Sequence, residues 1–369
     1  MKVAITADFH LNSAYPERKT TLEKILNSLK KKEIHHLIIA GDLFDKEQQN
    51  YSEFDNIANK FSEIHIYVIP GNHDPNISNR FFTASNLKVI TTDLDEKIIS
   101  IGNLNFLFIP YKPGFSTMDE AIDETIRKNT NHMENKIVLI SHGDYLSSSY
   151  ELNLYEEGYY MPLTYRCVEK HKFLKIFLGH IHKPTEYGII YYPGSPHPLD
   201  ITETGKRRII IFDTQTYKVS DEPVETPYIY FDETLITYPV ENEFELVKEN
   251  INNLINCWNL TPDELKKVIL RLKVKGYSTH KKKLSDTIFS FLKDKGITLY
   301  NNQIDLNELN LATPESQDFS EKIKLFHIVK KEIANRAANL YEIKNRFLNF
   351  TDIEEEALKI IFGDIEDKK

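Results

Sequence analysis

Short apolar runs alternate with amphipathic stretches over about the first 215 residues of the chain. Five of the runs have the length of buried strands, and two intervening stretches carry apolar residues at helical spacing. In one of these stretches, Leu22, Ile25 and Leu29 fall on a single helical face. The predicted strands are Val3–Ala7, Leu37–Ala40, Ile64–Ile69, Ile137–Ile140 and Ile176–Leu178, and the predicted helices cover 20–32 and 51–61.

Hairpins join the pattern later in the same region. Lys97–Ile101 and Asn105–Ile109 are strand-like and are separated by Gly102-Asn103, which is typical of a tight turn. Ile189–Tyr192 and Arg208–Phe212 are further strand candidates. Strands that first alternate with helices and later pair as hairpins predict a mixed α/β sandwich, with helices outside two packed sheets.

The pattern changes again after Asp213. A polar stretch around Pro223 and Pro227 reads as a linker, and the alternation in Val268–Val274 predicts a strand that is followed by a helix over 282–295 and a strand over 298–300. From Asp318 the chain is charged, and an apolar helical stripe runs through Ile323, Phe326, Val329, Ile333 and Ala337. We therefore expect a first domain over 1–222, a small α/β domain over 226–306 and a helical segment over 318–369.

The composition of the 369 residues is that of an ordinary globular protein, with 41% hydrophobic and 27% charged residues. Cys167 and Cys257 lie far apart and in no metal-binding spacing, which favours a reducing compartment. The N-terminal residues lack the pattern of a signal peptide, and no apolar run reaches the roughly 20 residues of a membrane helix. We expect a cytoplasmic protein with no membrane contact. The net charge of −9 does not by itself favour nucleic acid.

Carboxylate, imidazole and amide side chains follow directly after the predicted strands. The polar segments are Asp8-Phe9-His10, Gly41 to Asp45, Gly71 to Asp74, Ser141-His142 and Gly179 to His182. Side chains at the carboxyl ends of strands converge on one edge of an α/β sheet. Each segment alone is typical of a turn or a structural histidine, but all five in this order indicate a site for two divalent cations. Such a pair promotes in-line displacement at phosphorus.

These segments form five motifs: Asp-x-His, Gly-Asp-x-x-Asp, Gly-Asn-His-Asp, a later strand-end His and Gly-His-x-His. Taken together, the motifs resemble the calcineurin-like metallophosphoesterase superfamily. Within it, these motifs and the segment Tyr192-Pro193-Gly194-Ser195-Pro196 are similar to SbcD- or Mre-type DNA repair exonuclease subunits. The resemblance implies a four-layer αββα sandwich with a small α/β capping domain and a helical C-terminal segment. It also implies one cation held by Asp8, His10 and His182, a second held by Asn72, His142 and His180, and Asp42 bridging both.

The same resemblance implies roles for residues that are not ligands. His73 would protonate the leaving 3′-oxygen or stabilise the transition state, and Asp45 would pair with His73, unless Asp45 only caps a turn. Ser195 and His197 are candidates for contact with a substrate phosphate, and a surface role is the alternative for His197. Asp74 is expected to hold its loop. A group of tyrosines at 145, 150, 155, 159 and 160 either stacks on unpaired bases or packs in the fold.

These observations favour a Mn²⁺-dependent DNA nuclease: an exonuclease, with endonuclease activity as a further option. The resemblance implies a homodimer that works with an SbcC- or Rad-like coiled-coil ABC ATPase, and the chain has no phosphate-binding loop of its own. The terminal stripe would dock that partner, or else fold back on the chain. One alternative is a phosphodiesterase or phosphatase for a small molecule such as a cyclic nucleotide. Another is an architectural subunit without activity.

Overall fold

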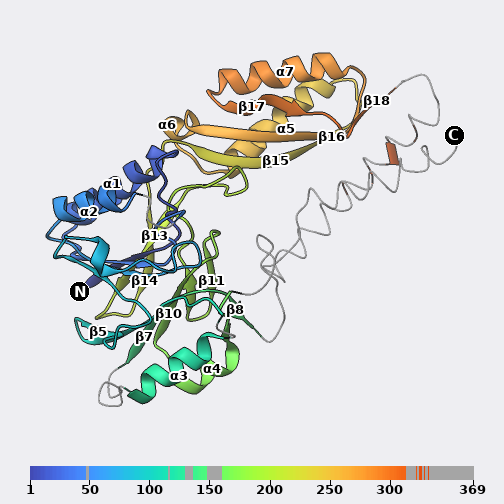
Figure 1. The fold of residues 1–369 in the computed structure, drawn as a ribbon. Coiled ribbons are helices and arrows are strands. Elements are labelled where there is room, and N and C mark those ends of the chain that lie inside the picture. The colour runs from blue at the N-terminus through green and yellow to red at the C-terminus, as the bar shows by residue number, and fades with distance from the viewer. Residues whose placement is uncertain are drawn as a thin grey trace. The chain divides into compact units, whose positions relative to one another are not determined.

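The computed structural model describes residues 1–46, 50–114, 117–128, 136–147 and 160–312, and five single positions between 321 and 331 (Figure 1). The chain divides into two compact units. The first consists of Met1–Leu199 and Lys206–Pro227, and the second of Asp200–Gly205 and Tyr228–Lys369. The predicted helical segment over 318–369, with its apolar stripe, lies outside the continuously described residues.

A six-stranded sheet forms one half of the first unit, in the order β14-β13-β1-β2-β3-β4. Strands β1 to β4 are parallel to one another, and β13 and β14 are antiparallel additions at one edge. Helices α1 and α2 pack on the outer face of this sheet. The bounds are β1 (Lys2–Thr6), α1 (Pro16–Lys31), β2 (His36–Ala40), α2 (Tyr51–Lys60), β3 (His65–Ile69), β4 (Leu87–Val89), β13 (Arg208–Asp213) and β14 (Val219–Pro223).

A second six-stranded sheet has the order β11-β12-β10-β7-β6-β5. Helices α3 and α4 pack on its outer face. The bounds are β5 (Ile98–Ile101), β6 (Leu104–Ile109), α3 (Met118–Lys128), β7 (Ile137–His142), α4 (Tyr165–His171), β10 (Lys175–Gly179), β11 (Thr185–Tyr187) and β12 (Ile190–Tyr192). A short 3-10 helix, η1 (Asn79–Phe81), and a two-stranded pair, β8 (Tyr145–Leu146) with β9 (Leu163–Thr164), complete the unit.

The two sheets pack face to face through an apolar core. Alternation along β1 separates the layers, because Val3 and Ile5 enter the core between the sheets whereas Ala4 faces α1 and α2. Phe177 and Phe212, from different sheets, lie in that core with ring centroids 5.5 Å apart. The predicted four-layer αββα sandwich is therefore confirmed.

One expectation about local structure was wrong, one helix was missed and another begins earlier than predicted. Pro223 does not lie in a linker but is the last residue of β14, an edge strand. Proline is tolerated there because a residue at this position does not have to donate a backbone hydrogen bond to the neighbouring strand. Helix α5 was not predicted from the sequence, although its apolar residues Val247, Ile251 and Ile255 recur at a spacing of four and are all buried. Helix α1 begins at Pro16, earlier than predicted, since proline is favoured in the first turn.

The second unit is a parallel sheet built on β16, whose neighbours are β15, β17 and β18. Val268, Leu270, Leu272 and Val274 of β16 are all buried, as their alternation predicts, and contribute to one core with α5 and α7. The bounds are β15 (Ile229–Thr237), α5 (Glu243–Cys257), α6 (Pro262–Leu265), β16 (Val268–Ser278), α7 (Lys281–Asp294), β17 (Thr298–Asp305) and β18 (Leu309–Leu311).

Within the described residues, every helix is too short or too polar to cross a bilayer. Both cysteines are free, Cys167 buried and Cys257 exposed.

Removal of the Phe177 ring tests the core between the sheets. Phe177→Ala should lower the free energy of unfolding of the first unit by about 3–5 kcal/mol, because the ring is fully buried and its cavity cannot be refilled. Tyr165→Ala, at a half-exposed aromatic of the same unit, should change it by about 0.5 kcal/mol or less. Urea unfolding followed by circular dichroism measures both, and equal effects would contradict the assignment of this core.

Candidate metal centre

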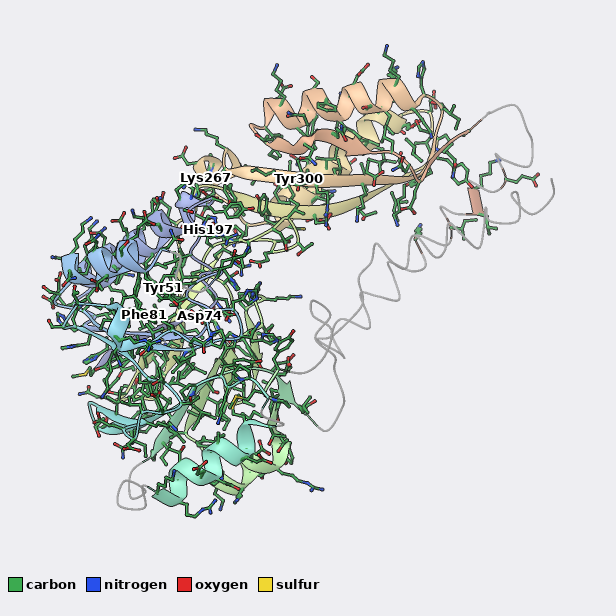
Figure 2. The ribbon with its side chains drawn as sticks, in the orientation of Figure 1. Tyr51, Asp74, Phe81, His197, Lys267 and Tyr300 are labelled. Atoms are coloured by element: carbon green, nitrogen blue, oxygen red, sulfur yellow. The ribbon has the colours of Figure 1, made fainter. Side chains whose placement is uncertain are left out.

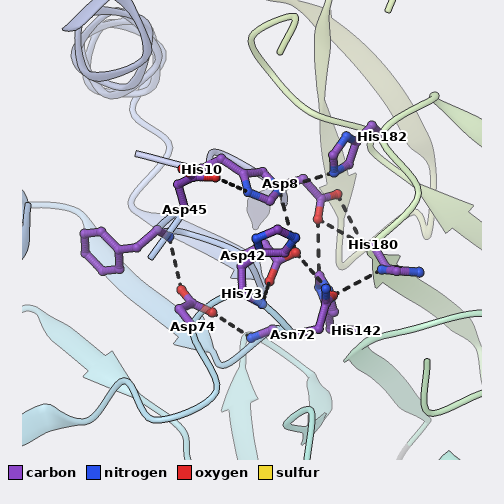
Figure 3. A network of polar contacts seen from close by, with 12 residues as sticks. Asp8, His10, Asp42, Asp45, Asn72, His73, Asp74, His142, His180 and His182 are labelled. Atoms are coloured by element: carbon purple, nitrogen blue, oxygen red, sulfur yellow. Dashed lines mark hydrogen bonds and ion pairs between the residues drawn. The ribbon is translucent and has the colours of Figure 1, made fainter. Parts of the chain in front are cut away.

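All seven predicted metal ligands meet at one edge of the sandwich (Figure 3). Asp8 and His10 follow β1, Asp42 follows β2 and Asn72 follows β3, whose parallel pairing brings their carboxyl ends together. The second sheet contributes His142 at the end of β7, and His180 and His182 after β10. The site therefore depends on both sheets and on the core that joins them.

Asp8, His10 and His182 form one group of donor atoms, all within 4.8 Å of one another. Nε2 of His10 lies 3.2 Å from Nε2 of His182. Two imidazole nitrogens that face each other this closely, beside a buried carboxylate, are a suitable set of ligands for one divalent cation.

Asn72, His142 and His180 form a second group. Oδ1 of Asn72 lies 2.8 Å from Nε2 of His142 and 3.2 Å from Nδ1 of His180. An amide oxygen between two imidazole nitrogens again presents the mixture of donors that a divalent cation accepts.

Asp42 lies between the two groups. Its Oδ2 is 3.3 Å from Nε2 of His142 and 3.7 Å from Nε2 of His10, and its Oδ1 accepts a hydrogen bond of 2.9 Å from the backbone N–H of His73. A single carboxylate oxygen thus faces a ligand from each group. These residues fit a pair of divalent cations that share Asp42.

The second ring nitrogen of three histidines faces an acceptor. Nδ1 of His142 lies 2.9 Å from the carbonyl oxygen of Ala40, and Nε2 of His180 lies 3.8 Å from Oδ1 of Asp144. Nδ1 of His10 lies 3.6 Å from Oδ1 of Asp45. The hydrogen bond with Ala40 fixes the orientation and tautomer of His142, and the two nearby carboxylates favour the orientation of His10 and His180. Asp144 was not predicted from the sequence, although it follows the ligand His142 by two residues and is buried.

Asp45 contacts a different histidine from the one that the sequence suggested. Its carboxylate lies beside His10 and accepts a hydrogen bond of 2.8 Å from the amide of Asn12. The hydrogen bond with His10 is the main cause that lowers the pKa of Asp45 to about 2, with partial burial opposing it. These contacts favour a role for Asp45 in orienting His10. The predicted pairing of Asp45 with His73 stays a prediction.

His73 lies in the centre beside His10 and Asp42. Its ring packs edge-on against His10, with centroids 4.5 Å apart, and is partly exposed to solvent. It also belongs to a group with His10 and Asp42 whose donor atoms lie within 4.8 Å of one another. The position is compatible with proton donation to a substrate, and that role stays a prediction.

Asp74 ties together two of the loops that carry ligands. Its carboxylate is fully buried and accepts hydrogen bonds from the backbone N–H groups of Gly71 (2.8 Å) and Phe44 (3.1 Å). Burial, and then the nearby charge of Asp42, raise the pKa of Asp74 to about 7. The residue holds its loop, as expected.

Ser195 and His197 lie in the interior of the first unit. Both are fully buried, and His197 lies inside the first unit, with Nδ1 3.0 Å from Oγ1 of Thr21 in α1 (Figure 2). Oγ of Ser195 accepts a hydrogen bond of 2.6 Å from the guanidinium of Arg207. Their burial does not favour contact with a phosphate, and that contact stays a prediction. Ser195 instead donates its backbone N–H to the carbonyl oxygen of His182 at 3.1 Å.

The buried carboxylates are balanced by imidazoles. Burial alone would raise the pKa of Asp42, but the charge and hydrogen bond of His142, with the charges of His10 and His73, hold it well below its usual range. For Asp8, burial prevails over its histidine neighbours and raises the pKa. A cation next to Asp8 would offset this unfavourable burial of its charged form.

Four of the site residues adopt left-handed backbone conformations. Asp8, His10, Asp42 and His180 have φ angles of 56°, 48°, 50° and 96°. Residues other than glycine rarely adopt such backbone angles, and each residue that does is strained by about 1–3 kcal/mol. The packing of the sandwich maintains these strained conformations, and they direct the four side chains into the centre.

Comparison with known proteins identifies the fold and its chemistry. The profile of the calcineurin-like phosphoesterase family matches residues 1–212. The chain belongs to this family. It is therefore a phosphoester hydrolase, and the resemblance inferred from the motifs is confirmed.

Two curated relatives have different activities in their names. The SbcD component of the nuclease SbcCD from Staphylococcus saprophyticus is 25% identical over 259 residues, which cover 60% of this chain and 68% of the relative. A "Probable cyclic nucleotide phosphodiesterase" of Coxiella burnetii is 26% identical over 255 residues, covering 62% of this chain and 97% of the relative. A solved archaeal phosphodiesterase overlaps with a TM-score of 0.31 at 15% identity, over 60% of this chain and 99% of its own.

Gly179 tests how tightly the centre is packed. A Cβ atom there would lie 2.0 Å from the carbonyl oxygen of Ala40, which is the acceptor for His142, and 2.7 Å from Nδ1 of His142 itself. Gly179→Ala should therefore displace His142 and lower Mn²⁺ binding, measured by calorimetry, by about tenfold or more. At Gly188 a Cβ atom meets nothing within 4 Å, and its left-handed φ of +64° adds strain of about 1–2 kcal/mol away from the centre, so Gly188→Ala should bind Mn²⁺ as the wild type does. Unchanged binding by both variants would contradict the packing described.

Asp45→Asn distinguishes the two roles of Asp45. If the carboxylate orients His10, the variant should bind one of two Mn²⁺ ions about tenfold more weakly. If it serves His73 instead, turnover should fall while Mn²⁺ binding is unchanged. Asp123→Asn is the matched control, because Asp123 also contacts a histidine, His171, at 2.6 Å, but remote from the centre.

Proposed function

We propose that this protein is a Mn²⁺-dependent DNA nuclease, the nuclease subunit of a DNA end-processing complex of the SbcC–SbcD or Mre–Rad kind. The observation that supports it best is the second folded unit, β15 to β18 with α5 and α7. The alignment with the phosphodiesterase relative covers 97% of that relative but 62% of this chain, so more than a third of this chain lies outside it. An enzyme for a small molecule has no evident need of a further α/β unit.

The proposed ligand assignment follows the two donor groups. Asp8, His10 and His182 would hold one cation, Asn72, His142 and His180 would hold the other, and Asp42 would contribute to both sites. When bound, such a pair of cations supplies an activated water and charge neutralisation for displacement at phosphorus. The imidazole of His73, held by its backbone bond to Asp42, donates a proton to the leaving 3′-oxygen.

The second unit offers a surface of mixed charge for DNA. On β16, Arg271, Lys273 and Lys275 alternate with the residues of the unit's core and so face away from it. Arg271 is paired with Asp232, and Nζ of Lys275 lies 3.2 Å from Glu308. Because these acidic partners offset part of the charge, we expect a partner to strengthen DNA binding by this chain. A coiled-coil ABC ATPase and a second copy of the chain, in a reducing cytoplasm, are the proposed partners.

The small-molecule alternative is favoured by the similarity to the Coxiella phosphodiesterase. An inactive architectural role is disfavoured by Asp8 and Asp42, because burying two carboxylates without a cation is unfavourable.

Digestion of end-labelled duplex and hairpin DNA in Mn²⁺ tests the proposal. The full chain, with and without an SbcC-like ATPase, should shorten labelled DNA, and His73→Ser should lower the rate by about 100-fold or more while Mn²⁺ binding is retained. His65→Ser, at an exposed histidine on the opposite end of β3, is the matched control. Hydrolysis of cyclic nucleotides without cleavage of DNA would establish the alternative, and absence of any Mn²⁺-dependent hydrolysis would favour the architectural role.

A further inference from the structure

Two arginines of the first unit are buried next to the metal centre. Arg18, in α1, is 6% exposed, and Arg207, directly before β13, is 2% exposed. A guanidinium is almost never buried unless its donors are satisfied, because it loses its hydration. The acceptors that these two side chains use are therefore informative.

Arg18 donates a hydrogen bond of 2.7 Å from Nη1 to the main-chain carbonyl oxygen of His10. Its guanidinium also lies over the ring of Tyr15, with Cζ 4.3 Å from the ring centroid. The main chain at His10 is thus fixed to helix α1.

Arg207 joins two loops with one guanidinium. Its Nη2 donates to the carbonyl oxygen of His182 (2.5 Å) and to Oγ of Ser195 (2.6 Å), while its Nε donates to the carbonyl oxygen of Ser195 (2.8 Å). The backbone N–H of Ser195 donates to the same carbonyl of His182 at 3.1 Å. The main chain at His182 is therefore held from two directions.

The two arginines act on ligands of the same donor group. His10 and His182 face each other through their Nε2 atoms (Figure 3) and both lie beyond the ends of their strands, β1 and β10. In the other group, His142 is part of β7 and pairs with Gly179 in the sheet. The sheet thus fixes the main chain of His142 directly. At His10 the backbone N–H is held by the carbonyl oxygen of Asp42 (3.0 Å), and the carbonyl oxygens of His10 and His182 are held by the two guanidinium groups.

We propose that Arg18 and Arg207 are positioning residues that place His10 and His182 for one cation before it binds. Each does so through the main-chain carbonyl of its histidine. The affinity of the site formed by Asp8, His10 and His182 then depends on both guanidinium groups, while the other site does not. The inference rests on the proposed ligand assignment.

Charge and geometry can be separated at Arg207. Its Nε and Nη2 reach two carbonyl groups at once, and a lysine ammonium keeps the charge but lacks this planar fork. If positioning matters, Arg207→Lys should lose metal affinity as Arg207→Met does. If only the buried positive charge matters, Arg207→Lys should behave as the wild type.

The test is titration of the full-length protein with Mn²⁺, followed by calorimetry and by electron paramagnetic resonance. His182→Ala and His180→Ala report how the chain binds when one or the other site is lost. In Arg18→Met, Arg207→Met and Arg207→Lys, one ion should bind about 10–100-fold more weakly, and the other with the affinity that remains in His182→Ala.

Two neighbouring basic residues, Arg208 and Lys19, provide matched controls. Arg208 pairs with Asp221, and Lys19 lies 3.3 Å from Glu53, so Arg208→Met and Lys19→Met should bind both ions normally. The inference is overturned if both affinities are unchanged in the Arg18 and Arg207 variants, or if both fall equally, which would indicate general destabilisation. If circular dichroism shows that a methionine variant is unfolded, the Mn²⁺ affinities of Arg207→Lys decide whether the inference holds. A wild type that binds two Mn²⁺ ions without cleaving DNA would overturn the proposed function and leave this inference intact.

Discussion

The shared carboxylate of Asp42 is the contact on which the centre depends. It is buried at the end of β2, its Oδ2 faces a histidine from each donor group, and its Oδ1 accepts the N–H of His73. Because one side chain serves both groups, their separation is set by the position of a single strand end. Any shift of β2 against its neighbours would disturb both groups together.

The rest of the sandwich keeps that strand end in place. The donors come from two sheets, so the apolar core around Phe177 and Phe212 determines how far His142 and His180 lie from Asp42. Asp74 then joins the loop after β3 to the loop after β2 through two backbone hydrogen bonds. Stability and site geometry are coupled because the same packing provides both.

The centre also carries strain and concentrated charge. Left-handed conformations at Asp8, His10 and Asp42 are unfavourable for residues with side chains, and buried carboxylates are unfavourable without compensation. Imidazoles offset part of the charge of Asp42, and cations would offset more. The arginines at positions 18 and 207 act at the main chain instead, where they hold the strained segments.

The alternation of apolar residues by itself predicted most strands, the two-sheet sandwich and the edge at which the ligands meet, because strand and helix periodicities are local. The assignment of seven metal ligands came from the resemblance of the polar segments to a known family, and the structure brings these seven side chains together. The tertiary structure alone decided that Asp45 lies against His10, that Asp144 faces His180 and that Ser195 and His197 are buried. Arg18 and Arg207 gave no signal in the sequence, because their acceptors are backbone carbonyls, which every residue has, brought near only by folding.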